Sequence, residues 1–362
     1  MKPTDKIQTG ILAENPANWK QKMARWVRLN LFIPDAKIGW FPFAVRTGQK
    51  IIMMEKPDII FSSSPPPTVH LIARSLAKKN NLKWVADFRD PWTEINYYDE
   101  SARSSMGRQL DRRLEDKVLN SADRVMLISK LDADYYFADR VDKERRIYLP
   151  NGYDEEDFTH LRQPDNPDEQ FTLMHLGAVN RERNPRNLFQ AIRELAEEKI
   201  ISPETFKLVF VGLVERPVQD EISRQGIKDY VDFIKYVPHR KALEMGLAAS
   251  ALLLLINQSP NSKRIVTGKI FEYMRLGKYI LAFGQRDGEV AGLLDEFGNG
   301  RIVDYGSTDE IRKTLMTILK NWQEEKPAPG TNDFRITGFN RHELTRNLAT
   351  IFADLIQEGK SH

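Results

Sequence analysis

The sequence predicts an α/β protein of two doubly wound domains, and three observations support this class. Short apolar runs alternate with amphipathic helical segments from residue 59 onward. The alternation is interrupted once by a polar stretch and then resumes. The expected strands are mostly apolar, which is typical of strands in a parallel sheet that helices cover on both faces.

The first alternation defines an N-terminal domain over residues 1–158. We expect strands at 59–63, 83–88, 124–128 and 146–149, and helices at 68–79, 103–119 and 131–137. Pro67 stands directly before the first helix, where the fixed φ angle of proline suits a helical first turn. The stretch 159–170 is rich in Pro, Asp and Asn, which favour turns and loops, and is therefore the expected linker.

The second alternation defines a C-terminal domain over residues 171–330. We expect strands at 172–176, 207–211, 231–234, 252–256, 279–283 and 302–303, and helices at 185–199, 217–225, 241–250 and 309–320. A short helix precedes the strand 279–283. The tail 340–358 is expected to form a helix that crosses back to the first domain.

The composition restricts the chemistry and the compartment. The chain has no cysteine, which excludes disulfides and thiolate metal sites and agrees with the reducing cytoplasm. Its six histidines lack the spacing of a metal site, so we expect no protein-bound metal. The longest apolar runs, 208–214 and 251–256, are too short to cross a bilayer. No nucleic-acid-binding motif is present, so we expect no nucleic-acid partner.

The N-terminal segment is basic and contains an amphipathic pattern. Over residues 18–31, Trp19, Met23 and Trp26 recur at helical spacing among lysines and arginines. One interpretation is a helix that contacts anionic lipid headgroups, as a peripheral protein at the inner face of the membrane would. The other is a solvated helix packed on its own domain. The sequence leaves both interpretations open.

The segment 267–289 carries the clearest indication of chemistry. Lys269 and Glu272 lie on a short predicted helix that leads into a buried strand. After the strand, Gly284 and Gly288 free the backbone just before a second helix. The unpaired N–H groups at such a helix start favour an anion such as a diphosphate. An ordinary αβα unit of a doubly wound domain would show the same pattern.

This segment resembles the C-terminal signature of the family-4 glycosyltransferases, the large retaining GT-B family. In that signature a Lys-x-x-Glu-Tyr/Ala-x-x-x-Gly helix is followed by a strand and a glycine-acidic loop. Further blocks match family landmarks in the same order along the chain, at 57–67, 85–92, 122–125, 149–154, 175–177 and 183–185. The resemblance implies a GT-B-like fold, with two Rossmann-like domains facing a cleft.

The resemblance also implies a retaining hexosyltransferase. Such an enzyme moves a sugar from a nucleotide-diphosphate donor to a glycan or lipid-linked acceptor, here for surface polysaccharide biosynthesis. The nucleotide sugar is a co-substrate, and no cofactor is expected. Retention would proceed by front-face displacement, in which the departing diphosphate accepts the proton of the acceptor hydroxyl. The protein would then supply positioning and charge stabilisation.

By the same resemblance, seven residues are expected to bind the donor: Gly177, Arg183, Lys269, Glu272, Gly284, Gly288 and Glu289. Glu272 matches a glutamate that accepts hydrogen bonds from the ribose hydroxyls, and Arg183 stands where many relatives have a diphosphate-binding lysine. Ala178 and Arg264 depart from the family, which often has an arginine and a glutamate at these positions. A surface glutamate and a solvated arginine loop are the alternative interpretations of Glu272 and Arg183.

Arg89 and Asp90 are the candidate catalytic residues. They end the strand 83–88 at the carboxyl edge of the first sheet, where ligands bind in open α/β sheets. Asp90 could orient the acceptor and Arg89 could hold the phosphate. Equally, the two could form a buried ion pair that caps the loop before Trp92.

The N-terminal domain also departs from the family pattern. Nothing in residues 1–52 resembles the strand and glycine-rich loop with which family members begin, so about two βαβ steps of about 30 residues each are expected to be missing. Two rival functions therefore stay open. One is a nucleotide-sugar 2-epimerase, for which His175 and His239 would be the acid–base candidates. The other is a non-catalytic donor-binding remnant or partner subunit.

Overall fold

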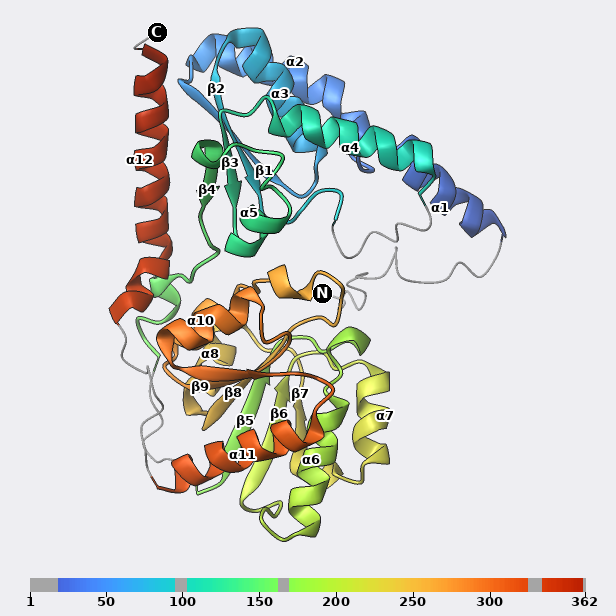
Figure 1. Cartoon of the computed structure of the whole chain (residues 1–362), viewed down its shortest axis with the longest axis vertical. Helices are drawn as coiled ribbons and strands as arrows, with labels where there is room; N and C mark the ends of the chain where they lie inside the picture. The colour runs from blue at the N-terminus through green and yellow to red at the C-terminus, as the bar shows by residue number, and fades with distance from the viewer. Residues whose placement is uncertain (1–18, 95–102, 162–168, 325–333, 361–362) are drawn as a thin grey trace, which may run out of the picture. The chain divides into compact units, whose positions relative to one another are not determined.

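The computed structural model describes residues 19–94, 103–161, 169–324 and 334–360, and the chain forms two compact units. Unit 1 comprises Met1–Leu149 and Leu348–His362, and unit 2 comprises Pro150–Asn347. Each unit contains one sheet whose strands are all parallel (Figure 1). The predicted α/β class with two parallel sheets is confirmed. Of the expected linker 159–170, residues 162–168 lie outside the described part.

Unit 1 has a four-stranded sheet in the order β1-β2-β3-β4. The strands are β1 (Ile59–Ser64), β2 (Lys83–Phe88), β3 (Arg124–Leu127) and β4 (Arg146–Tyr148). The helices are α1 (Trp19–Leu31), α2 (Phe41–Glu55), α3 (Thr68–Asn80), α4 (Ser105–Leu119) and α5 (Lys130–Tyr135). All four strands were predicted, because short, mostly apolar segments alternate with helical segments at these positions.

Helix α2 is the one long element of unit 1 to which the sequence patterns assigned nothing. Its apolar residues do not form a single stripe, and its first turn contains Pro42. Tertiary packing stabilises it instead. Gly48 lies against α3 so closely that a Cβ there would come within 2.6 Å of Leu76 Cδ1. Since the glycine permits this approach, α2 packs along α3.

The two faces of the unit 1 sheet are covered by different helices. Trp84, Ala86 and Phe88 of β2 point to the face covered by α3 and α4. On the other face, Phe61 of β1 packs against Phe352 of α12 (Arg341–Lys360), with ring centroids 5.7 Å apart. Helix α12 is continuous, and its residues from Leu348 onward belong to unit 1.

Unit 2 has a six-stranded sheet in the order β10-β9-β8-β5-β6-β7. The strands are β5 (Phe171–Leu176), β6 (Phe206–Val211), β7 (Val231–Ile234), β8 (Ala251–Leu255), β9 (Tyr279–Phe283) and β10 (Gly300–Val303). The first strand of the unit, β5, therefore lies in the middle of the sheet. The chain turns to one side for β6 and β7 and to the other for β8, which places a topological switch point between β5 and β8.

Helices cover both faces of this second sheet (Figure 1). One face packs against α6 (Arg186–Glu197), α7 (Arg216–Arg224) and α11 (Thr308–Gln323). The other packs against α8 (His239–Ala248), α9 (Lys269–Arg275) and α10 (Glu289–Phe297). The inner strands β5, β6, β8 and β9 are almost fully buried, as their largely apolar sequences predicted, whereas the edge strands β7 and β10 are partly exposed. Within the described ranges, no helix is long and apolar enough to cross a membrane.

Candidate functional site at the carboxyl edge of the second sheet

The strands β5 and β8 stop pairing through their backbones before their carboxyl ends. Their ladder comprises Leu173 with Ala251 and Met174 with Leu252. Beyond it, side chains take over. The imidazole Nδ1 of His175 lies 2.8 Å from the carbonyl oxygen of Leu253, and the N–H of Leu176 donates to Tyr273 Oη over 2.9 Å. The switch point is thus held by two side chains, one of which comes from α9.

His175 is uncharged in this position. The ring is fully buried, and burial together with the nearby positive charge of Lys269 lowers its pKa to about 3. Because a carbonyl oxygen only accepts hydrogen bonds, Nδ1 carries the proton. Within the described residues, Nε2 has no hydrogen-bond partner. The sequence had suggested His175 only as an acid–base candidate of the rival epimerase. In the structure it is a positioning residue that joins β5 to β8.

Lys269 lies directly over Gly177, the first residue after β5. Gly177 has a φ of +118°, which L-amino acids with a side chain rarely adopt. A Cβ at Gly177 would also overlap Nζ of Lys269. A glycine is therefore required at this point, both for the backbone turn and for the lysine head group. This contact brings the start of α9 to the carboxyl end of β5.

Two cations, Lys269 and Arg183, lie near each other at this edge. Burial, and next the positive charge of Arg183, lower the pKa of Lys269 to about 8, and Glu272 acts in the opposite direction. Arg183 lies in the 3₁₀ turn η5 (Arg181–Arg183) and donates from Nε to Asn257 Oδ1. Asn257 follows β8 closely, so the guanidinium is held at the switch point. An anion such as a diphosphate would relieve the repulsion between the two cations.

The neighbouring arginines are less well placed. Arg181 and Arg186 also lie near Ala178, where the family often has an arginine. Both are exposed, and Arg186 lies 3.9 Å from the carboxylate of Glu221. Arg183 is the half-buried member of the three.

Glu272 lies in the first turn of α9 and is half-buried. Its Oε1 is 3.1 Å from Nε2 of His239, and Nδ1 of the same ring is 3.6 Å from Asp157 Oδ2. The Glu272 carboxylate is thus only partly exposed, and it lies close to the His239 imidazole and to the positive charge of Lys269. The pattern had offered no reason to place His239 beside Glu272, since 33 residues separate them.

The glycine loop after β9 packs against the same edge. A Cβ at Gly284 would lie 2.9 Å from Ile256 Cδ1, next to the asparagine that holds Arg183. Gly288 precedes α10 with a φ of −90°, and a Cβ there would lie 3.1 Å from the carbonyl oxygen of Lys263. Both glycines thus serve close approach rather than a left-handed turn. Glu289 begins α10 and is only 7% exposed.

Six of the seven predicted donor-binding residues therefore follow or approach the carboxyl ends of β5, β8 and β9: Gly177, Arg183, Lys269, Glu272, Gly284 and Gly288. Glu289 joins them as the first residue of α10. Sequence reasoning missed Tyr273, His175 and Asn257 as positioning residues. The sequence contained an indication for Tyr273, because it stands at the Tyr/Ala position of the family pattern. No pattern indicated Asn257.

Arg89 and Asp90 lie in unit 1, directly after β2. Arg89 Nε donates to Asp87 Oδ2 over 2.8 Å, and Ser63 Oγ donates to the same oxygen over 2.7 Å. Arg89 thus pairs with Asp87, and the alternative interpretation of an ion pair between Arg89 and Asp90 is wrong. Burial raises the pKa of Asp90 above the usual carboxyl range. Asp90 lies at the carboxyl edge as predicted.

The loop that follows Asp90 is held by buried polar contacts. Trp92 Nε1 donates to Asp111 Oδ1 over 2.9 Å, and Thr93 Oγ1 donates to Glu115 Oε2 over 2.8 Å. Both carboxylates belong to α4 and are buried. Helix α4 therefore fixes the backbone that presents Asp90.

Two family models match consecutive parts of the chain. Residues 11–157 match the model described as Glycosyltransferase Family 4, and residues 157–332 match the model described as Glycosyl transferases group 1. The chain belongs to the glycosyltransferases. The probable glycosyltransferase WbjE of Pseudomonas aeruginosa is 23% identical over 255 residues, which are 67% of this chain and 61% of that relative. The match thus spans about three fifths of the curated relative.

Solved glycosyltransferase-like structures share this fold. Anabaena HepE, crystallised in complex with UDP, superposes with a TM-score of 0.65 at 16% identity, covering 86% of this chain and 82% of that one. Sucrose-phosphate synthase from Thermosynechococcus elongatus superposes with a TM-score of 0.67 at 14% identity, covering 89% of this chain and 80% of that one. The predicted GT-B fold of this glycosyltransferase is thereby confirmed.

Proposed function

We propose that this glycosyltransferase moves a sugar, as a retaining hexosyltransferase, from a nucleoside diphosphate donor to a glycan or lipid-linked acceptor. The observation that carries the proposal is the pair of cations, Lys269 and Arg183, at the β5–β8 switch point. Nucleotides bind at this position in doubly wound sheets. HepE, which has the same fold, was crystallised with UDP and with UDP-glucose.

The donor would be bound in two parts. Lys269 and Arg183 would bind the diphosphate, assisted by backbone N–H groups near Gly177 and at the start of α10. Glu272 would accept hydrogen bonds from the two ribose hydroxyls, in place of the His239 ring that it now contacts. The same cations stabilise the diphosphate as it leaves, so the reaction needs no bound metal or organic cofactor.

The acceptor would be activated by the leaving group itself. As the bond between the anomeric carbon and the diphosphate breaks, the acceptor hydroxyl attacks the same face and passes its proton to a phosphate oxygen. This order retains the configuration at the anomeric carbon. We assign Asp90 to orienting the acceptor hydroxyl, since Arg89 is engaged by Asp87.

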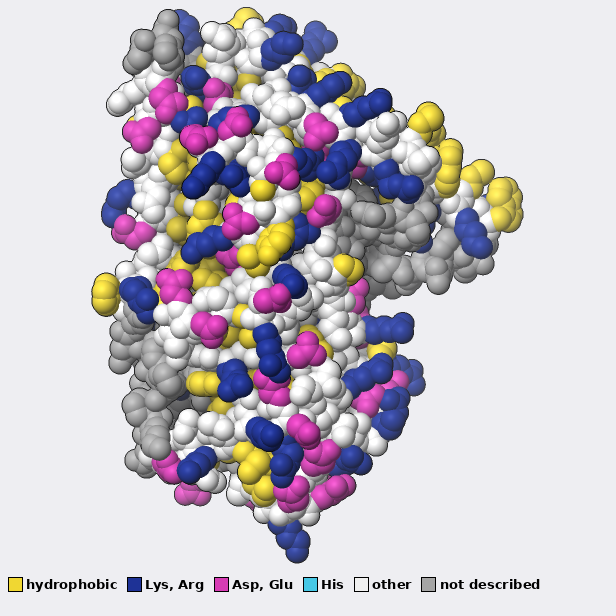
Figure 2. All heavy atoms as spheres, in the orientation of Figure 1, with side chains coloured by type: hydrophobic (Ala, Val, Ile, Leu, Met, Phe, Trp, Pro, Cys, Tyr) yellow, Lys and Arg dark blue, Asp and Glu magenta, His cyan; other side chains and the backbone are white. Residues whose placement is uncertain are grey.

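We also propose that the protein acts in the cytoplasm, at the inner face of the membrane, in surface polysaccharide synthesis. The support is α1, on which Trp19, Met23 and Trp26 share one face and are 66%, 54% and 52% exposed. Figure 2 shows hydrophobic side chains along the segment that Figure 1 labels α1, with Lys and Arg side chains beside them. Such a face suits an anionic lipid surface.

Calorimetry with wild type and two variants tests the donor site. Glu272→Ala should weaken binding of a nucleoside diphosphate at least about tenfold, because the ribose loses a charged acceptor. Binding of inorganic pyrophosphate, which lacks a ribose, should stay unchanged. Glu296→Ala, an exposed glutamate on α10, is the matched control. Equal nucleotide affinity in the Glu272→Ala variant would remove the assignment.

Product analysis separates the proposed reaction from its rivals. Incubation with a nucleotide sugar and an acceptor should give a glycoside whose anomeric proton coupling, measured by NMR, matches that of the donor. An isomerised sugar formed without acceptor would indicate the epimerase. Nucleotide binding with neither transfer nor donor hydrolysis would indicate a binding subunit. The burial of His175 and its bond to Leu253 argue against the epimerase, because they remove one acid–base candidate.

A further inference from the structure

The helical side of unit 1 carries an apolar groove with a basic rim. The groove has a volume of about 770 Å³ and lies between the segment before α2, helix α3 and helix α4. Its floor includes Ile38, Leu71 and Leu114. Four cations line it: Arg74, Lys78, Lys79 and Lys117. An apolar floor beneath a positively charged rim fits an anionic amphiphile rather than a neutral or cationic partner.

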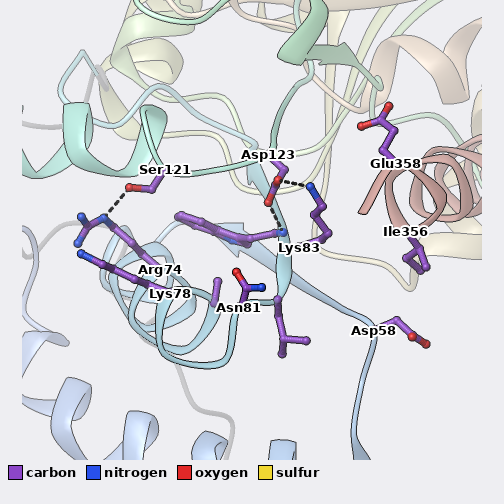
Figure 3. A pocket seen from close by; sticks show the side chains of 12 residues that line it. Asp58, Arg74, Lys78, Asn81, Lys83, Ser121, Asp123, Ile356 and Glu358 are labelled. Atoms are coloured by element: carbon purple, nitrogen blue, oxygen red, sulfur yellow. Dashed lines mark hydrogen bonds and ion pairs between the residues drawn. The ribbon is translucent and has the colours of Figure 1, made fainter. Parts of the chain in front are cut away.

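A second, polar hollow adjoins the groove. Its volume is about 660 Å³, and it lies at the amino edge of the unit 1 sheet, where Lys83 begins β2. Asn81 and Ser121 line it, and Arg74 and Lys78 line both hollows. Figure 3 shows the side chains of Arg74 and Lys78 running side by side at one end of this hollow. An apolar space, a pair of cations and a polar space therefore follow one another across α3.

The cations between the hollows are available for an anion. Arg74 Nε donates to the carbonyl oxygen of Lys117 over 3.1 Å and to Ser121 Oγ over 2.9 Å, which fixes the guanidinium. Within the described residues, neither Nη group of Arg74 has a hydrogen-bond partner, and no carboxylate lies within 4.0 Å of the head groups of Lys78, Lys79 or Lys117.

Two of the three carboxylates that line the polar hollow are engaged in ion pairs. The third, Asp58, is exposed, and Figure 3 shows it on the opposite side of the hollow from Arg74 and Lys78. Asp123 pairs with Lys83 over 3.1 Å, and Glu358 pairs with Arg124 over 2.6 Å. These pairs leave Arg74 and Lys78 as the exposed charge between the two hollows. A phosphate placed there would find a fixed guanidinium and a flexible ammonium group.

We infer that the two hollows together bind an anionic phospholipid of the membrane whose headgroup carries hydroxyls, such as phosphatidylglycerol. The acyl part occupies the groove, the phosphate binds Arg74 and Lys78, and the headgroup hydroxyls lie near Asn81 and Ser121. The inference deepens the membrane contact of the proposed function and rests on it. The occupant is a membrane lipid rather than the acceptor, because Arg89 and Asp90 lie at the opposite, carboxyl edge of the sheet.

The surroundings of the groove fit contact with a bilayer. Phe41 lines the groove, and its neighbours Trp40 and Phe43 are 54% and 72% exposed. Leu110, on the α4 side, is 48% exposed. Exposed aromatic and aliphatic groups beside unpaired cations are typical of proteins that lie on an anionic lipid surface.

Vesicle co-sedimentation of the full chain tests the inference. Wild type should bind vesicles containing phosphatidylglycerol and should not bind pure phosphatidylcholine vesicles. Lys78→Glu combined with Lys79→Glu should reduce the binding at least about tenfold, because each basic residue at an anionic surface contributes appreciably. Lys313→Glu combined with Lys320→Glu, two exposed lysines of α11, makes the same charge change in unit 2 and should bind as wild type does.

A second variant separates the groove from general electrostatic attraction. Leu110→Gln leaves the charge unchanged but makes the groove wall polar, and should weaken binding several-fold. Thermal melting followed by circular dichroism checks that each variant is folded. The inference is overturned if wild type does not distinguish the two vesicles, if the two double variants bind equally, or if Leu110→Gln binds as wild type does. Binding of UDP in unit 2, measured on the same protein, reports separately on the proposed function.

Discussion

At the scale of single residues, the electrostatics of the carboxyl edge of the unit 2 sheet depend on which side chains are charged. Lys269 is held near Arg183, and both burial and this neighbour disfavour its protonated form. His175 is buried and neutral, so it adds no further positive charge. Lys269 and Arg183 therefore repel each other in the free protein, and a bound diphosphate would reduce this repulsion.

The Lys269→Met variant should bind a nucleoside diphosphate about tenfold to a hundredfold more weakly, because one charge-assisted contact is lost. Calorimetry measures this change. The matched control is Lys278→Met, which removes another lysine whose pKa is lowered by burial but which stands before β9, away from the carboxyl edge. Equal losses of affinity in both variants would contradict a specific role for Lys269.

The affinity for nucleoside diphosphate should also depend on pH. The pKa of Lys269 in the free protein is about 8, so the ammonium group is charged below that pH and is neutralised above it. We expect affinity to fall as pH rises through 8, and we expect this fall to be absent in Lys269→Met. Calorimetric titrations of both proteins with nucleoside diphosphate at pH 7 and pH 9 measure this difference. An equal fall in affinity for wild type and Lys269→Met would contradict the role of Lys269.

The same pKa gives a stability prediction of opposite sign. The folded pKa of Lys269 lies below the value of about 10.5 in an unfolded chain, so burial destabilises the fold while the group is charged, and stability rises as pH increases through this range. Lys269→Met should be more stable than wild type at pH 7, by about 1–3 kcal/mol. Denaturant unfolding at pH 7 measures the difference.

At the scale of elements, short contacts from helices hold the sheet edges in shape. In unit 2, α9 contributes Tyr273 to the end of β5, and His175 bridges β5 to β8. In unit 1, α4 contributes Asp111 and Glu115 to the loop after β2. Both arrangements use buried side-chain hydrogen bonds. Such bonds are costly to break, because a buried donor or acceptor is left without a partner.

Glu115→Ala should destabilise unit 1 by about 3–5 kcal/mol, because the carboxylate is fully buried and accepts from Thr93, Tyr136 and Arg140. Removing it leaves Arg140 with the half-exposed carboxylate of Asp116, 2.6 Å away, as its remaining ion-pair partner among the described residues. Glu358→Ala, which breaks the partly exposed pair with Arg124, should cost about 1 kcal/mol or less. Denaturant unfolding compares the two, and similar costs would show that the α4 network is not what holds the loop.

At the scale of the whole molecule, the candidate sites belong to two separate folding units. Every donor candidate belongs to Pro150–Asn347, whereas the lipid hollows and Asp90 belong to the unit formed by Met1–Leu149 and Leu348–His362. A ligand that binds one unit should therefore stabilise that unit preferentially, since only its folded state binds the ligand.

Scanning calorimetry with UDP should show this selectivity. At a ligand concentration of about 100 times Kd, the unfolding of unit 2 should be stabilised by about 2.7 kcal/mol. The heat absorption that stays at its original temperature should be the one that Glu115→Ala shifts downward. If UDP and Glu115→Ala move the same single transition, the two units do not unfold separately.

The sequence by itself determined the strand order along the chain, both parallel sheets and the edge on which the candidate donor-binding residues lie. Apolar runs between amphipathic segments suffice for this, because burial on both faces of a strand leaves a local pattern. The positions of Gly177, Lys269 and Glu272 followed from the same patterns and from the family resemblance.

Only the tertiary structure decided how those residues act on each other. Most of these contacts join residues from separate elements: Lys269 with Gly177, Arg183 with Asn257, and Glu272 with His239. The pairing of Arg89 with Asp87 depends on the direction of the arginine side chain. The helix α2, too, is stabilised by packing on α3 rather than by its own pattern. Periodicity reports which side of an element is buried, but not which neighbour buries it, and the charge of a buried group depends on that neighbour.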